Sequence, residues 1–263
     1  MAIKIMIDAG HYRNYNRSCV YKPYYEGNMT FKLQGYLKTE LEKYGFVVGV
    51  TKTSVAQDVA LYSRGYKAKG YDVFLSLHSN ACDSESVDRV VIIKGYDQND
   101  KLAKLFGEAI QEVMGTKQAY QIYTRRNSSG GEYYGVLRGA KSAKVNNRFI
   151  IEHGFHTNTA TAKWLYSDEN LKKLAKAEAK VLANYFGMTK KEEGTFKQYI
   201  VRTTADSLNG RKGAGTSYDV EIKVKKGTAV TIVGEKTVNG TKWLKTKTGY
   251  WISSKYTEFV RYV

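Results

Sequence analysis

The sequence predicts an α/β fold, a mostly parallel twisted sheet flanked by helices, followed by a small all-β domain. In residues 1–187, short apolar runs alternate with stretches whose apolar residues recur every three or four positions, which is typical of strands alternating with helices. From Phe196 onward the helical period is absent, and short β-rich segments are separated by turns that contain glycine. Alternating strands and helices favour a largely parallel sheet, whereas closely spaced short strands favour a barrel or sandwich.

Strands and helices are expected in turn through the first region. The strands are KIMID (4–8), FVVGVT (46–51), VFLSLH (73–78), VVIIK (90–94) and RFIIE (148–152). The helices are a stretch through Leu33, Leu37 and Leu41 that ends at Gly45, residues 55–69, an amphipathic stripe over 102–113, and residues 171–185 before Gly187. VFLSLH and VVIIK are nearly continuous apolar runs, which indicates strands covered on both faces.

The second region is expected to contain only strands. These are YIVRT (199–203), VEIKV (220–224), AVTIVG (229–234), KWLKTK (242–247) and YWISS (250–254), separated by the turns NGRKGAG, KKG, VNGT and TG. A short polar stretch, TKKEEGT, precedes them, as expected of a linker. We therefore predict a first domain at 1–187, a linker at 188–194 and a second domain at 195–263.

The chain is strongly basic, with 42 Lys and Arg against 25 Asp and Glu and a formal net charge of +17. Residues 189–263 hold 15 basic against 7 acidic residues, a balance of +8, whereas residues 1–188 hold 27 against 18, a balance of +9 over more than twice the length. Such a charge favours an anionic partner, either nucleic acid or an anionic cell-wall polymer. No nucleic-acid-binding signature supports the first alternative.

The sequence shows no membrane or export signal. No apolar run reaches the about 18 to 20 residues of a membrane span, so no membrane partner is expected. The N-terminus lacks the basic region, apolar core and cleavage site of a signal peptide. We therefore expect cytoplasmic accumulation, with another factor releasing the protein toward any outside substrate. Cys19 and Cys82 are too few for a disulfide framework and suit a reducing compartment.

Polar residues stand at the ends of three predicted strands. His11 follows the first strand, His78 ends VFLSLH, and Glu152 ends RFIIE. Ligands in open α/β sheets bind at the carboxyl ends of the strands, so these side chains are expected at one edge of the sheet. Glu26 stands just before the first helix, whose N-terminus should face the same edge. Two imidazoles and a carboxylate form a common catalytic zinc set that leaves a fourth position for water.

Structural explanations compete with this interpretation. A histidine at a strand end is more often hydrogen-bonded than metal-bound, and Glu26 alone is an ordinary carboxylate that favours a helix N-terminus. Glu152 is harder to explain structurally, because a half-buried carboxylate inside FIIEHGF is costly without a partner. The residue pattern therefore indicates a metal site without assigning its ligands.

Four motifs carry a family resemblance over about residues 1–187. DAGH, then EGN at the start of a helix, then SLHSNA, then IIEHGFHTN occur in the order found in the zinc-dependent N-acetylmuramoyl-L-alanine amidases of the amidase-3 family, which this region resembles. The resemblance implies that His11, Glu26 and His78 are zinc ligands and that Glu152 is the catalytic carboxylate. It also implies that the substrate is peptidoglycan, cut at the amide between N-acetylmuramic acid and the L-alanine of the stem peptide.

The second region resembles a bacterial SH3 domain, a small barrel that binds cell walls. SLNGRKGAGTSYDV is similar to the signature segment of that domain, and KWLKTKTGYWISSKY is similar to its closing hairpin. The resemblance implies an SH3-like barrel that binds peptidoglycan or an anionic cell-wall polymer. A lytic domain followed by a wall-binding domain is similar to the arrangement in phage endolysins.

The chain departs from the family pattern at two places. Thr51–Lys52 stands where family members often carry Thr-Arg, and His153 follows the expected catalytic glutamate where a small or apolar residue is common. His153 and His156 are therefore alternative ligands, although alternation along a strand should point His153 away from Glu152. The segment HTN, residues 156–158, is expected to be a loop that opens the next helix.

Two further side chains near the motifs have candidate roles. Cys82 follows His78 by four residues and has the chemistry of a soft ligand, but a lone buried thiol is more often inert. Asp8 is expected to orient a ligand histidine rather than to bind the metal itself.

The resemblance implies hydrolysis by a metal-activated water. A metal would polarise the scissile carbonyl, lower the pKa of bound water toward about 7 and stabilise the oxyanion. Glu152 would take the proton of the water and pass it to the departing nitrogen. Two rival functions remain: a zinc peptidase or deacetylase acting on another cell-wall amide, and a non-catalytic basic binding protein in which these four residues are structural.

Overall fold

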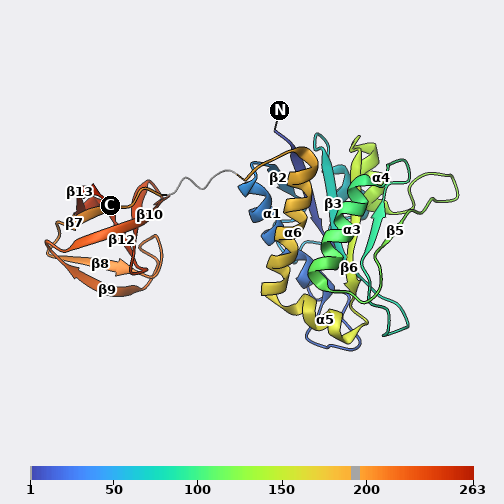
Figure 1. The fold of residues 1–263 in the computed structure, drawn as a ribbon, viewed down its shortest axis with the longest axis horizontal. Coiled ribbons are helices and arrows are strands. Elements are labelled where there is room, and N and C mark those ends of the chain that lie inside the picture. The colour runs from blue at the N-terminus through green and yellow to red at the C-terminus, as the bar shows by residue number, and fades with distance from the viewer. Residues whose placement is uncertain (1, 191–195) are drawn as a thin grey trace. The chain divides into compact units, whose positions relative to one another are not determined.

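The computed structural model describes residues 2–190 and 196–263 of the 263-residue chain. The chain forms two compact units, Met1–Lys191 and Glu192–Val263 (Figure 1). The predicted linker, residues 188–194, falls in part on residues outside those described.

The first unit is built on a six-stranded sheet. Its strands are β1 (Lys4–Ala9), β2 (Val47–Val50), β3 (Val73–Asn80), β4 (Val91–Lys94), β5 (Gln121–Tyr123) and β6 (Asn147–Phe155), in the order β2-β1-β3-β6-β4-β5. β1, β2, β3 and β6 are parallel. β4 runs antiparallel to β6, and β5 is parallel to β4. The predicted α/β fold with a mostly parallel sheet is confirmed.

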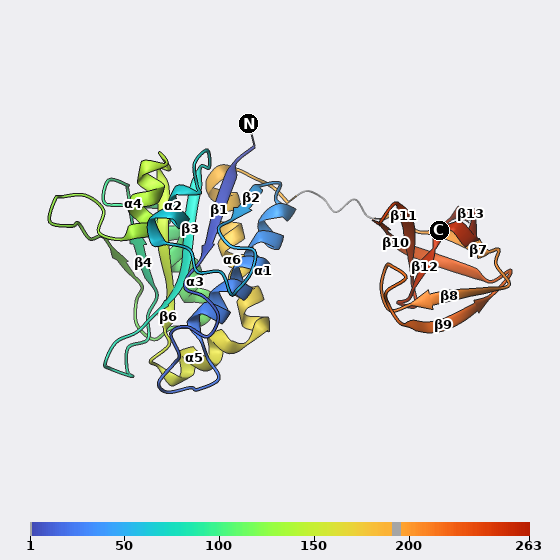
Figure 2. The same ribbon diagram turned by 180° about the vertical axis from the view of Figure 1, so that it is seen from behind.

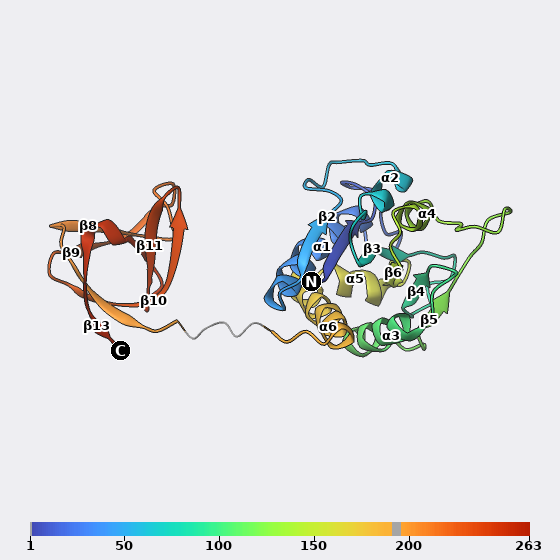
Figure 3. The same cartoon turned by 90° about the horizontal axis from the view of Figure 1, so that it is seen from above.

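Helices cover both faces of this sheet (Figures 2 and 3). They are α1 (Glu26–Lys43), α2 (Leu61–Tyr66), α3 (Lys101–Met114), α4 (Gly135–Ser142), α5 (Thr159–Tyr166) and α6 (Asp168–Phe186). α1, α3 and α6 lie on one face, and α2 and α4 lie on the other. In neither described range does a helix combine the length and the apolar character that crossing a membrane would require.

Alternation along the strands divides the core into two layers. Leu75 and Leu77 of β3 pack in the layer that holds the leucines of α1, α3 and α6. Phe74 of β3 and Ile150 of β6 pack in the other layer, with the apolar side of α4. His78 and Glu152 continue this second series, so the expected site lies on the sheet face that α2 and α4 cover.

One predicted helix is shorter than expected. A helix over residues 55–69 is wrong for its first part, because α2 begins only at Leu61. Before it, the backbone N–H of Gln57 donates to the carbonyl of Ser54, and Gln57 Oε1 accepts from the backbone N–H groups of Thr53 and Ser54. Local side-chain bonds of this kind compete with the hydrogen bonds of a helix.

β5 and α4 are absent from the sequence prediction. β5 has three residues, which is too short for a recognisable strand period. α4 contains Gly135 and Gly139, and glycine weakens a helical signal. A Cβ at Gly139 would lie 2.1 Å from the carbonyl oxygen of Tyr62, so glycine is required where α4 crosses α2. Gly139 therefore weakens the helical signal of α4 in the sequence and also allows α4 to pack against α2.

Two boundaries predicted for the later helices are confirmed, namely the loop before α5 and the end of α6 at Gly187. Asn158 Oδ1 accepts from the backbone N–H of Thr161 at 3.0 Å and caps α5, so HTN is the loop that opens this helix. α6 begins after Ser167, whose side chain accepts from Asn170 N, and ends at Gly187 in the left-handed conformation with φ 65°.

The second unit is an all-β domain, as predicted. Its strands are β7 (Tyr199–Thr203), β8 (Ser207–Arg211), β9 (Val220–Lys225), β10 (Ala229–Val238), β11 (Thr241–Thr246), β12 (Trp251–Ser253) and β13 (Thr257–Tyr262), antiparallel in the order β13-β7-β10-β11-β12-β8-β9. Its core is formed by Val201, Leu208, Val224, Val230, Ile232, Leu244 and Ile252. β8 and β13 were not predicted, because the asparagine and glycine of SLNGR favour a turn and β13 lies beyond the last predicted segment.

Candidate active site

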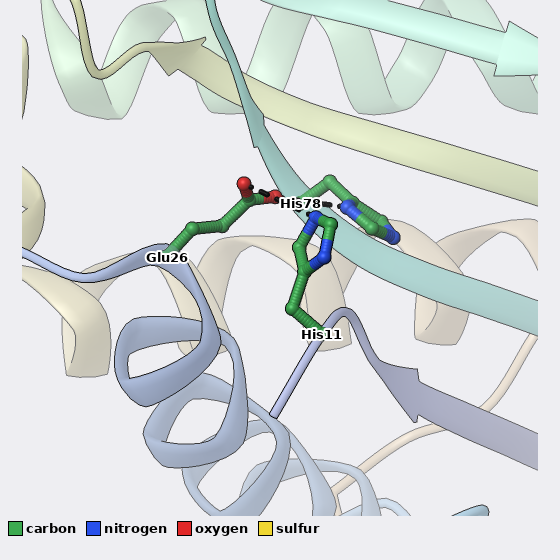
Figure 4. Close-up of side chains that lie close together, drawn as sticks. All are labelled: His11, Glu26 and His78. Atoms are coloured by element: carbon green, nitrogen blue, oxygen red, sulfur yellow. Dashed lines mark hydrogen bonds and ion pairs between the residues drawn. The ribbon is translucent and has the colours of Figure 1, made fainter. Parts of the chain in front are cut away.

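His11, Glu26 and His78 lie together at the carboxyl edge of the sheet (Figure 4). His11 follows β1, Glu26 is the first residue of α1, and His78 lies near the end of β3. Glu26 Oε2 lies 3.3 Å from His11 Nε2, and Glu26 Oε1 lies 2.8 Å from His78 Nδ1. One ligand atom from each residue lies within 4.8 Å of the other two, so the three residues form a group that could hold a metal ion.

The turn after β1 brings His11 and His78 close. The backbone N–H of Gly10 donates to the carbonyl of Leu77 at 3.0 Å, which fastens the turn to β3. A Cβ at Gly10 would lie 2.4 Å from His78 Cε1, so only glycine leaves room for the His78 ring. His11 has a positive φ of 58°, and Lys52 Nζ donates to its carbonyl oxygen. The strained backbone of His11 is therefore held by a buried lysine.

The loop between His11 and α1 contacts the side chains of His11 and Glu26. The ring of Tyr15 stacks on the imidazole of His11, with centroids 4.7 Å apart and planes inclined by 18°. The side-chain amide of Asn16 donates to Glu26 Oε2, and the backbone N–H of Glu26 donates to the carbonyl of Asn16 at 3.0 Å. His11 and Glu26 are thus oriented before any ligand arrives.

The cluster keeps Glu26 ionised. Burial alone would raise the pKa of Glu26, but the hydrogen bonds and charges of His11 and His78 hold it well below its usual range. Burial lowers the pKa of the His78 imidazole, which Glu26 only partly opposes. A neutral imidazole and an ionised carboxylate are the forms that bind metal ions.

Glu152 lies beside the cluster on the neighbouring strand. Its Cα pairs with that of His78 in the β3–β6 register. Among the described residues Glu152 Oε2 has no hydrogen-bond partner although it is buried. Burial raises the pKa of Glu152 well above its usual range, and the negative charge of Glu26 raises it further. A buried carboxyl without a partner next to a possible metal group is typical of an active site rather than of a structural core.

Asp8 has a different role from the one expected. It is fully buried, and its carboxylate accepts from Arg64 Nη2 at 2.7 Å, Thr51 Oγ1 at 2.6 Å and Ser76 Oγ at 2.7 Å. Burial opposes ionisation, but Arg64 and these hydrogen bonds hold the pKa of Asp8 below its ordinary value. The expectation that Asp8 orients a ligand histidine is wrong, because its charge is taken up by Arg64 of α2.

The two alternative histidines lie outside the cluster. His153 points to the opposite face of β6, as alternation predicted, where Nε2 lies 2.5 Å from Glu178 Oε1 of α6 and Nδ1 lies 2.9 Å from the carbonyl oxygen of His78. His156 Nδ1 lies 3.0 Å from Ser79 Oγ. Cys82 Sγ donates to a backbone carbonyl at 3.2 Å and belongs to no metal-competent group in the described part of the chain.

Sequence reasoning missed the residues that support the site. Tyr15 and Asn16 lie in a loop without periodic pattern, and Glu178 reads as one more exposed charge on an amphipathic helix. The sequence contains one indication of these supporting contacts, because Lys52 and His153 differ from the family pattern. Both are polar side chains at buried positions, and a buried polar side chain needs a partner. The partners themselves, the carbonyl of His11 and the carboxylate of Glu178, depend on tertiary contacts.

Comparisons with known proteins identify the family of the first unit. Residues 5–184 match the model of the Amidase_3 family, described as N-acetylmuramoyl-L-alanine amidase. A search of curated proteins finds no match.

Solved amidase structures share the fold. The catalytic domain of CwlV, an N-acetylmuramoyl-L-alanine amidase from Bacillus (Paenibacillus) polymyxa var. colistinus, has a TM-score of 0.61 and 16% identity over 71% of this chain and 99% of that chain. An N-acetylmuramoyl-L-alanine amidase from Clostridium difficile 630 has a TM-score of 0.60 and 19% identity over 73% and 99%. AmiC2 of Nostoc punctiforme, also an N-acetylmuramoyl-L-alanine amidase, has a TM-score of 0.59 and 20% identity over 70% and 97%. Because the family model also spans more than half of the sequence, the chain belongs to the Amidase_3 family of N-acetylmuramoyl-L-alanine amidases.

Proposed function

We propose that the chain is a zinc-dependent peptidoglycan hydrolase that cleaves the amide between N-acetylmuramic acid and the L-alanine of the stem peptide. The observation that carries the proposal is the metal-competent group of His11, Glu26 and His78 next to Glu152, whose buried Oε2 atom has no hydrogen-bond partner among the described residues. Membership of the amidase family supports amide hydrolysis in the cell wall.

The donor set fits zinc. Two imidazole nitrogens and one carboxylate oxygen are ligands that zinc takes in catalytic sites, with a position left for water or substrate. Glu26 turns one carboxylate oxygen toward each histidine, Oε2 at 3.3 Å from His11 Nε2 and Oε1 at 2.8 Å from His78 Nδ1, and one donor atom from each residue lies within 4.8 Å of the other two. Zinc bound there would supply a Lewis acid that polarises the scissile carbonyl and acidifies a water molecule.

Glu152 is proposed to move the proton. Water that attacks a carbonyl must lose a proton, and the departing nitrogen of L-alanine must gain one. The Glu152 carboxyl makes no competing hydrogen bond through Oε2 within the described residues, and its environment raises its pKa and so its basicity. In its ionised form it can accept the proton from water, and it can then return that proton to the leaving group. Its pairing with His78 in the sheet places it next to the metal-competent group.

The second unit is proposed to be an SH3-like module that brings the enzyme to the wall, as in phage endolysins. Residues 189–263 carry a balance of +8, which suits an anionic cell-wall polymer. A groove of about 530 Å³ in this unit is lined in part by Trp243, Tyr256, Arg211 and Lys255. Aromatic and cationic side chains around one groove suit a ligand that combines apolar and anionic groups.

Metal content and product identity test the proposal together. We expect one zinc per chain, activity that falls in parallel with zinc under a chelator, and new N-terminal L-alanine without new reducing sugar. A peptidase or deacetylase would release other ends, and a non-catalytic binding protein would release none. His78→Ala should lower zinc occupancy and abolish activity, whereas His156→Gln, which changes a histidine outside the group, should keep its zinc. Tight, stoichiometric zinc in the His78→Ala protein would exclude His78 as a ligand.

A further inference from the structure

Two exposed tyrosines stand beside the metal-competent group. The ring of Tyr15 stacks on the imidazole of His11, and the ring of Tyr12 lies against that of Tyr15 with centroids 4.9 Å apart. Tyr12 is 36% exposed and Tyr15 is 44% exposed. We name these two rings the tyrosine shelf. Because Tyr15 touches a member of the metal-competent group, a molecule held at that group can also reach the shelf.

The shelf is fixed to the first turn of α1. The backbone N–H of Tyr15 donates to the carbonyl of Tyr12 at 3.1 Å, and the carbonyl of Tyr15 accepts from the backbone N–H of Gly27 at 3.3 Å. A Cβ at Gly27 would lie 1.9 Å from the carbonyl oxygen of Tyr12, so this close contact requires glycine. Between the two tyrosines, Asn14 has a φ of 57°, and its backbone N–H and side chain both bond to the side-chain amide of Asn28. An aromatic surface held in this way loses little conformational entropy when it binds a ligand.

Packing within the protein does not account for both rings. Among the described residues, neither tyrosine belongs to the buried clusters that form the core of the first unit. Orientation of the His11 imidazole explains Tyr15, which touches that ring, but it does not explain Tyr12. Exposed tyrosines with an apolar face and a polar tip are typical of ligand-binding surfaces. The shelf therefore has the character of a binding surface next to the active site.

The order of the strands indicates which part of the substrate meets the shelf. His11 follows β1, His78 lies on β3 and Glu152 lies on β6, and these three strands are consecutive neighbours in the sheet. In the proposed reaction the L-alanine nitrogen lies against Glu152, which gives it a proton. The acyl substituent of the scissile carbonyl carbon extends away from that nitrogen, and the direction away from Glu152 along this edge is toward β1. This substituent is the lactyl group that carries the sugar ring of N-acetylmuramic acid.

We infer that Tyr12 and Tyr15 form a subsite for the sugar ring of N-acetylmuramic acid, on the acyl side of the scissile amide. The inference rests on the proposed function, because it assumes that Glu152 protonates the departing nitrogen. A pyranose ring has a flat face of C–H groups and polar groups around its edge, so it complements tyrosine rings that combine an apolar face with a polar tip. Contacts to this non-reacting part of the substrate hold the scissile amide in place.

Two ligands that differ only in the sugar test this subsite. One is an N-acetylmuramoyl-L-alanyl peptide, and the other is the same peptide acylated by O-methyl-lactic acid, which keeps the amide and lacks the sugar. Tyr12 is replaced rather than Tyr15, because Tyr15 also orients His11. In the full-length Tyr12→Ala protein we expect KM for the muramoyl compound to rise about fivefold, as the loss of one aromatic contact predicts, and KM for the lactyl compound to stay constant. Tyr12→Phe keeps the ring and should retain the KM of the wild type for both.

Tyr133→Ala is the matched control. Tyr133 is 41% exposed, and its ring also lies against that of another tyrosine, Tyr134, with centroids 5.1 Å apart. It follows β5, which three strands separate from β1 in the sheet. This substitution should change KM for neither compound.

Binding without turnover separates this inference from the proposed function. Calorimetry with the full-length, zinc-loaded Glu152→Gln protein measures affinity for the two ligands, with and without Tyr12→Ala. A loss of affinity confined to the muramoyl ligand supports the subsite even if the wild type releases no L-alanine, a result that would reject the proposed function alone. An equal loss for both ligands, no loss for either, or a loss of zinc from the Tyr12→Ala protein would overturn the subsite.

Discussion

Replacing Glu152 by glutamine tests the proton-transfer role without changing the size of the side chain. The amide cannot accept the proton of the attacking water, so we expect the chemical step to slow by about 10²- to 10⁴-fold. Zinc content should stay near that of the wild type, because the metal-competent group consists of His11, Glu26 and His78. Binding to purified walls should also persist, since we assign it mainly to the second unit.

The same substitution should change how the stability of the zinc-free protein depends on pH. Burial and the charge of Glu26 raise the pKa of Glu152 in the folded state above its unfolded value of about 4.3. The stabilising contribution of the bound proton is therefore complete below the unfolded pKa and is lost as pH rises through the folded pKa. Each unit of difference corresponds to about 1.4 kcal/mol.

Glutamine has no proton to lose over this range. The free energy of unfolding of zinc-free Glu152→Gln should thus fall less than that of the wild type as pH increases from about 4 upward. At low pH the two proteins should have similar stability, because the protonated carboxyl and the amide are both neutral and of similar size.

Three measurements decide the result. They are release of N-terminal L-alanine, zinc stoichiometry, and urea unfolding of the zinc-free proteins at several pH values. A folded, zinc-loaded Glu152→Gln enzyme with near-normal turnover would remove Glu152 from the mechanism. Loss of zinc would instead make Glu152 a ligand and reopen the role of Glu26. Parallel stability curves for the two proteins would refute the argument that burial and the charge of Glu26 raise the pKa of this carboxyl.

Three further predictions concern the support of the site and the second unit. Glu178→Leu leaves His153 buried without the carboxylate partner of its Nε2 atom and should lower the free energy of unfolding by about 3–5 kcal/mol, or Tm by roughly 6–20 °C. The double variant Glu178→Leu/His153→Leu should recover most of this stability. Equal melting temperatures for the single and the double variant would contradict the pairing. Gly10→Ala places a Cβ against the ring of His78 and should weaken zinc affinity at least tenfold by metal titration, and unaltered affinity would show that the ring can move. The second unit, expressed alone, should pellet with purified walls at low salt and release as salt rises, and an unbound domain at low salt would reject charge-based targeting.

The residue pattern alone predicted the elements that follow from local periodicity. Apolar runs and helical stripes depend on neighbours within a few positions, so the main strands, the long helices and the all-β second unit could be read directly. The general rule for open α/β sheets then placed His11, His78 and Glu152 at one edge. Segments of weak or conflicting local signal, such as 55–60, β5 and α4, could not be predicted in this way.

Contacts between distant residues were decided only by the tertiary structure. Asp8 binds Arg64 rather than a ligand histidine, and His153 is paired with Glu178, because the order of strands and the helices packed on each face determine which side chains meet. The local sequence determines on which face of its own helix or strand a side chain lies. The partner of a buried charge depends instead on which residues the fold brings within hydrogen-bonding distance.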